Sequence, residues 1–151
     1  MAQQTARIMP PAGRAYVAAV GLGGAILFAL SAGRLARSGI SVELAVFAAL
    51  TIVSGRFTLK IPSINSTLSV SEMFGFTCVL LFGPDAAAVT LALDSLVLGW
   101  RRRMTREQVL FNFGNLTLAV WISGAIFFAV AGVPPLFGSS APVTSRRPAP
   151  L

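Results

Sequence analysis

Five apolar segments alternate with shorter polar and basic stretches along the chain. They cover residues 15–33, 40–54, 69–82, 85–100 and 109–130. The first and the last are long enough to cross the hydrocarbon core of a bilayer, because a helix rises ~1.5 Å per residue and the core is ~30 Å thick. The pattern therefore predicts an all-α integral membrane protein with about five transmembrane helices.

The first apolar segment admits a second interpretation. Arg7 and Arg14 precede it, and Ala29-Leu30-Ser31 is a small-x-small sequence of the kind found at signal-peptide cleavage sites. The later apolar segments favour a first transmembrane helix over a cleaved signal.

Residues 55–66 break the helical pattern. Phe57, Leu59 and Ile61 alternate with polar and basic residues until Pro62, and alternation with period two is typical of an extended strand. A strand with free edges cannot cross lipid. We therefore expect a short strand-like interfacial loop between the second and third helices.

A sharp turn is predicted at Gly83-Pro84, because proline cannot continue the preceding helix. Asp85 follows at a position suited to capping the next helix. The third and fourth segments are therefore expected to form a tight helical hairpin.

The basic residues predict the orientation of this bundle. Most of the 12 lysines and arginines fall in the N-terminal stretch, the strand-like loop and the loop after the fourth segment. These residues are Arg7, Arg14, Arg56, Lys60, Arg101, Arg102, Arg103 and Arg106. Since positive loops stay in the cytoplasm, we expect a cytoplasmic N-terminus and an external C-terminus. Residues 1–14 then form a flexible cytoplasmic tail, 15–132 the transmembrane domain, and 133–151 a disordered tail.

Composition supports the membrane assignment. Hydrophobic residues make up 55% of the chain and charged residues 11%, whereas about 25% of a soluble domain is charged. There is no histidine and a single cysteine, Cys78, so the commonest general base and metal ligands are missing. We expect no catalysis, no metal and no cofactor. The net charge of +7 is attributed to basic residues that set the membrane orientation, and it does not indicate nucleic-acid binding.

Polar residues inside the apolar segments are the candidate ligand-binding groups, because ionisable groups are costly in a membrane. Asp94 lies near the middle of the fourth segment, where a structural hydrogen bond is the alternative role. Asn112 and Asn115 share a face of the fifth segment, and a short basic loop places Asn115 at the depth of Asp94. We therefore expect Asp94 to face the bundle interior with Asn115 or Asn112 as its partner. Glu72 belongs to a Ser-x-x-Glu capping pattern, or marks the mouth of a ligand cavity.

Two features bear on lipid and on helix packing. Arg101, Arg102 and Arg103 form a run that either anchors the topology or binds lipid headgroups. Gly21 and Gly24 favour the close approach of another helix, a spacing common in glycine-rich apolar segments.

Residues 55–132 combine the strand-like loop, a serine-rich helix start, an LLFGP turn and an FN pair at the start of the next helix. The sequence reads SINSTLSVSEMFGFTCVLLFGPDAAAVTLALDSL, then arginines, then VLFNFGNLTLAVWISGAIFFAVAG. These features resemble the membrane module that precedes HD-GYP phosphodiesterase and GGDEF diguanylate cyclase domains in bacterial cyclic-di-GMP signalling. In that family a sixth helix and a cytoplasmic output domain follow, and both are missing here.

The resemblance implies a sensory or ligand-binding membrane module, either truncated or stand-alone, in the bacterial inner membrane. Its expected partners are the lipid bilayer and a membrane partner subunit or second copy, with no nucleic acid. A looser similarity to the substrate-binding subunits of vitamin transporters gives the alternative function, solute binding for transport.

Overall fold

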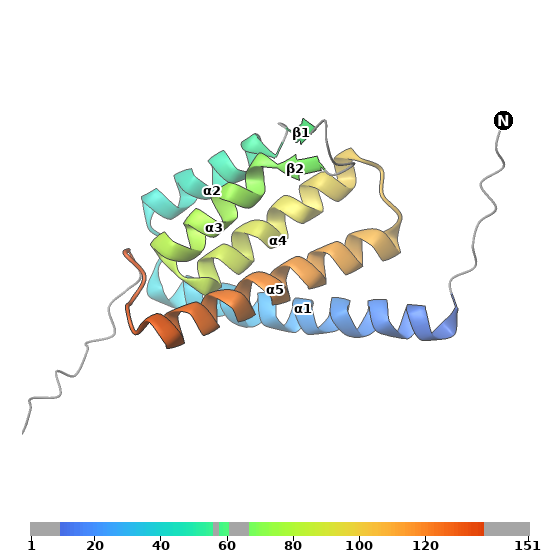
Figure 1. The fold of residues 1–151 in the computed structure, drawn as a ribbon, viewed down its shortest axis with the longest axis horizontal. Coiled ribbons are helices and arrows are strands. Elements are labelled where there is room, and N and C mark those ends of the chain that lie inside the picture. The colour runs from blue at the N-terminus through green and yellow to red at the C-terminus, as the bar shows by residue number, and fades with distance from the viewer. Residues whose placement is uncertain (1–9, 56–57, 61–66, 138–151) are drawn as a thin grey trace, which may run out of the picture.

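The computed structural model describes residues 10–55, 58–60 and 67–137 of the chain. Within these residues the chain forms five helices, as the hydrophobic pattern predicts. They are α1 (Pro11–Ser38), α2 (Val42–Ser54), α3 (Val70–Phe82), α4 (Pro84–Arg101) and α5 (Arg106–Ala131). Successive helices run in opposite directions, so each end of the bundle gathers alternate connections (Figure 1).

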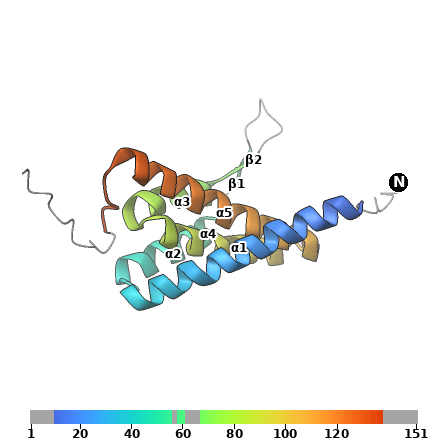
Figure 2. The same cartoon turned by 90° about the horizontal axis from the view of Figure 1, so that it is seen from below.

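Helix α4 is the centre of the bundle and contacts each of the other four helices. Its buried face consists mostly of small side chains, which let neighbouring backbones approach closely. The buried residues are Ala86, Ala87, Ala88, Thr90, Leu91, Ala92, Asp94, Ser95 and Gly99. Helices α1 and α5 lie side by side along one flank of α4 (Figures 1 and 2).

Helices α1 and α5 meet through glycine. A Cβ atom added to Gly24 would collide with the backbone of Gly114, and one added to Gly114 would collide with the carbonyl oxygen of Val20. The Gly21 and Gly24 spacing therefore does permit a close helix contact, and Gly114 supplies the opposite surface.

The strand-like loop is a two-stranded hairpin in the part that the structure describes. Strand β1 (Thr58–Lys60) pairs antiparallel with β2 (Thr67–Ser69), with Thr58 opposite Ser69. Helix α3 begins at the residue after β2. The sequence predicts the first strand but not its partner. Residues 61–66 lie outside the described residues, and the location of the hairpin at a membrane interface stays a prediction.

The turn at Gly83-Pro84 is confirmed, because α3 ends at Phe82 and α4 begins at Pro84. Gly83 has a φ of 89°, a left-handed conformation that glycine adopts without strain. The expected capping role of Asp85 is wrong. Gly83 is the N-cap of α4 and makes no side-chain capping bond, while Asp85 lies in the first turn and bonds to other helices.

The chain turns back after α5. Gly132 ends that helix in a left-handed conformation, with a φ of 66°. The N–H groups of Leu136 and Phe137 then donate to the carbonyl oxygens of Leu80 and Leu81, at 3.2 and 2.6 Å. Residues 133–137 therefore pack against the end of α3, where the sequence predicts disorder from residue 133. Residues 138–151 lie outside the described residues.

Two helices in the described residues, α1 and α5, are long and apolar enough to cross a membrane. The other apolar helices, including α2, are shorter. The five predicted helices are thus shown, and five membrane crossings stay a prediction.

Replacing Gly24 with alanine is expected to lower the melting temperature of the detergent-solubilised protein. The added methyl group would push α1 from α5, and such overpacking costs about 1–3 kcal/mol. Gly33 is the matched control, because a Cβ there meets nothing within 4 Å. Gly33→Ala should leave stability unchanged or raise it, since alanine is the better helix former. Equal melting temperatures for the two variants would contradict the close contact.

Candidate functional site

One carboxylate oxygen connects three helices at the end of the bundle where α4 begins. The Oδ1 atom of Asp85 accepts hydrogen bonds from the Ser31 hydroxyl at 2.7 Å and from the Trp121 indole N–H at 2.9 Å. The Arg34 guanidinium donates to the same atom at 3.2 Å. Helices α1, α4 and α5 are joined at this point, which we call the Asp85 junction.

Local sequence explains how the Asp85 junction forms. Ser31 and Arg34 are three residues apart on α1, so their side chains share one face of that helix. Asp85 lies in the first turn of α4, where the partial positive charge of the helix N-terminus favours a carboxylate. Trp121 reaches the carboxylate from α5.

The three bonds differ in their surroundings. Ser31 is fully buried, whereas the side chains of Arg34 and Asp85 are 54% and 31% exposed. A solvent-exposed ion pair contributes about 0–1 kcal/mol, while a hydrogen bond to a charged group contributes about 1.5–3 kcal/mol. The bonds from Ser31 and Trp121 therefore hold the helices, and Arg34 is the more exchangeable partner.

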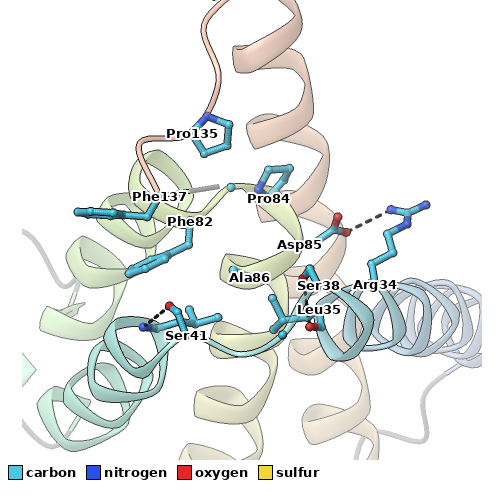
Figure 3. A pocket seen from close by; sticks show the side chains of 13 residues that line it. Arg34, Leu35, Ser38, Ser41, Phe82, Pro84, Asp85, Ala86, Pro135 and Phe137 are labelled. Atoms are coloured by element: carbon cyan, nitrogen blue, oxygen red, sulfur yellow. Dashed lines mark hydrogen bonds and ion pairs between the residues drawn. The ribbon is translucent and has the colours of Figure 1, made fainter. Parts of the chain in front are cut away.

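A cavity of about 420 Å³ opens beside the Asp85 junction. It lies where the α1–α2 connection, the α3–α4 turn and the residues after α5 come together (Figure 3). Polar and apolar atoms contribute about equally to its walls, with the Arg34–Asp85 pair on one side. The lining residues are Arg34, Leu35, Ser38, Gly39, Ser41, Leu44, Phe82, Gly83, Pro84, Asp85, Ala86, Pro135 and Phe137.

The residues after α5 form one wall of this cavity. The Phe137 ring stacks on that of Phe82, with centroids 5.7 Å apart and planes 29° from parallel. Pro135 lies against the α3–α4 turn, since its Cγ would be 3.0 Å from a Cβ added to Gly83. In Figure 3 the two aromatic rings lie across the cavity from Arg34 and Asp85.

The sequence prediction for Asp94 is partly right. Asp94 is 5% exposed and so faces the interior as expected. Its Oδ1 atom lies beside Gly55 at the end of α2, 2.8 Å from where a Cβ on that glycine would stand. Asn115 is exposed, and the Asn112 amide donates to the sulfur of Met104 at 3.5 Å. The structure therefore does not bring Asp94 and the two asparagines together.

The error comes from rotation about the helix axis. The predicted pairing used only depth, and the buried face of α5 carries Phe113, Gly114 and Thr117 instead of Asn115. Depth along an antiparallel pair does not determine which side chains face each other.

The remaining predicted residues lie away from the cavity. Arg101, Arg102 and Arg103 are exposed at the opposite end of the bundle. The side chain of Glu72 lies outside the described residues. Sequence reasoning missed Arg34 and Asp85, because Asp85 was interpreted as a helix cap. The Ser31–Arg34 spacing on an apolar helix is the signal that points to a carboxylate partner.

Comparison of the chain with protein-family models, with curated proteins and with solved structures gives no match.

Replacing Ser31 with alanine is expected to destabilise the protein by about 1–3 kcal/mol, because a partly buried hydrogen bond to a carboxylate is lost. Trp121→Phe, which removes the second interhelical donor, should have a similar effect. Ser123→Ala is the control, since Ser123 is exposed and bonds only within its own helix, to the Val120 carbonyl. Thermal unfolding in detergent measures all three. A Ser31→Ala protein as stable as Ser123→Ala would show that the junction does not hold the helices.

Proposed function

We propose that the chain is a non-catalytic, multi-pass membrane protein that binds a small molecule in the cavity beside the Asp85 junction. Its role is that of a sensory membrane module of a bacterial signalling protein. The observation that carries this proposal is the cavity itself, which combines apolar side chains, one ion pair and a wall made by the residues after α5.

The outer surfaces of the longest helices support a membrane location. In the most apolar 18-residue stretch of each, 17% of residues are buried in α1 and 22% in α5. Large apolar side chains therefore point outward, among them Leu22, Ile26 and Val130 at 65%, 62% and 83% exposure. An apolar surface of this extent on a soluble protein would cause aggregation, whereas lipid covers it without cost.

The charge difference between the two ends supports a cytoplasmic N-terminus. Arg14, Arg106 and the run 101–103 lie at the end where α1 begins and α4 joins α5 (Figure 1). The cavity end carries Arg34 and Arg37, and Arg34 is paired with Asp85. By the positive-inside rule the first end is cytoplasmic, so the cavity opens toward the external side of the inner membrane.

The lining of the cavity indicates the class of ligand. The volume of about 420 Å³ lies within the usual range for small-molecule sites, about 300–1,000 Å³. Phe82, Leu44 and Ala86 offer apolar contact, and the half-exposed Arg34 offers hydrogen-bond donors at the edge. The expected ligand is a small amphipathic molecule, with an apolar part and a polar part that accepts hydrogen bonds.

The wall contributed by Phe137 gives a route for signalling. This wall is held by two backbone bonds and one aromatic stack, and a ligand that fills the cavity would contact Phe82 and Phe137 directly. Occupancy of the cavity is thereby coupled to the position of the chain after α5.

Fusions to the C-terminus test the membrane arrangement. We expect alkaline phosphatase to be active and green fluorescent protein to be dark, because five crossings place the C-terminus outside. The protein should also stay with membranes after alkaline extraction. A fluorescent fusion with inactive phosphatase would contradict the proposed orientation, and release by alkali would contradict insertion.

A buried cysteine measures access to the cavity. Ala86 lines the cavity and is 1% exposed, so Ala86→Cys in a Cys78→Ser background should react slowly with benzyl methanethiosulfonate. Adding Phe137→Ala should raise the rate at least tenfold, since the aromatic wall is lost. Phe127→Ala is the control, because Phe127 is on the surface of α5 and does not line this cavity. Equal rates in both variants would show that Phe137 does not close the site.

A further inference from the structure

The cytoplasmic-facing end of the proposed arrangement carries two adjoining hollows between α4 and α5. They measure about 690 and about 450 Å³ and share Leu96, Met104 and Val109. Leu110 and Phe113 extend the second hollow along α5. Together they form an apolar groove, which we call the α4–α5 groove.

Arginines stand at the edge of the α4–α5 groove. Arg101 and Arg103 line the first hollow and Arg106 lines the second, whereas Arg102 lines neither. All four are exposed. Three of these four arginines therefore adjoin the groove, and Arg102 does not.

The connection between α4 and α5 holds these arginines in defined places. Arg103 adopts a φ of 50°, and the N–H of Met104 donates to the Gly99 carbonyl at 3.1 Å. Thr105 then starts α5 through a reciprocal capping pair with Gln108. A cap of this kind satisfies two free backbone donors, so the basic groups are presented from a structured turn.

Trp100 completes the edge of the groove. It is 82% exposed and lines the first hollow. Exposed tryptophan is typical of the boundary between hydrocarbon and headgroups, where its ring suits both surroundings. The basic edge, Trp100 and the apolar groove thus match the phosphate, the interfacial region and the acyl chain of a phospholipid.

We propose that the α4–α5 groove binds one anionic phospholipid, with the phosphate on Arg101, Arg103 and Arg106 and an acyl chain along Leu96, Leu110 and Phe113. This inference rests on the proposed membrane location. Basic pockets between helices on the cytoplasmic side suit anionic headgroups. A free phosphate would use the arginines but would leave the apolar groove empty.

Native mass spectrometry of the delipidated, full-length protein in detergent tests the site. We expect phosphatidylglycerol to be retained in preference to phosphatidylcholine, and inorganic phosphate at millimolar concentration not to displace it. Arg106→Gln should weaken retention about fivefold, the effect of one charge near an anionic lipid. Leu96→Gln, at a side chain that is 40% exposed, should weaken retention without removing charge.

Arg102→Gln is the matched control, because it removes the same charge four residues from Arg106 without touching the groove. Its retention should stay within twofold of the unchanged protein. Equal losses in the Arg102 and Arg106 variants, equal retention of the two lipids, or displacement by inorganic phosphate would each overturn the proposal. A protein that extracts from membranes at alkaline pH fails the proposed function instead, so the two failures are distinguishable.

Discussion

The Oδ1 atom of Asp85 accepts three hydrogen bonds from two other helices, and the arrangement of the bundle depends on this atom. The Asp85 side chain is only partly exposed, and a carboxylate that has lost part of its water needs hydrogen-bond donors in return. Asp85 finds them on α1 and α5 at once, so the helices cannot slide along one another without breaking a bond. The junction fixes the relative height of α1, α4 and α5, and with it the shape of the adjacent cavity.

Small residues make this junction geometrically possible. The alanines on the buried face of α4 and the contact between Gly24 and Gly114 bring helix backbones close together. In the proposed membrane location there is no hydrophobic force between helices, so packing and polar bonds would carry their association. Close packing of the helix backbones brings short side chains such as Ser31 within hydrogen-bond distance of Asp85.

The five helices could be predicted from the sequence, whereas the second strand and the site could not. Gly83-Pro84 marks a helix boundary by covalent chemistry alone, and the length of the apolar segments sets the helices on either side. The pairing of Asp94 with Asn115 failed because spacing gives depth but not the rotation of a helix about its axis. Asp85 was missed for a related reason. A carboxylate beside a turn is expected to cap the next helix. Only tertiary packing shows that Asp85 accepts hydrogen bonds from Ser31 and Trp121 instead.

The hydrogen bonds to Asp85 are of two kinds, one that holds the helices together and one that a ligand can replace. Ser31 is fully buried, whereas Arg34 is half exposed beside the cavity. A ligand with a hydrogen-bond acceptor can engage Arg34 at small cost, because an exposed ion pair contributes little stability. The bonds from Ser31 and Trp121 remain, so the helices keep their heights. In the proposed site, binding would therefore exchange the Arg34 contact and leave the three helices joined, with the ligand lying against the wall that carries Phe137.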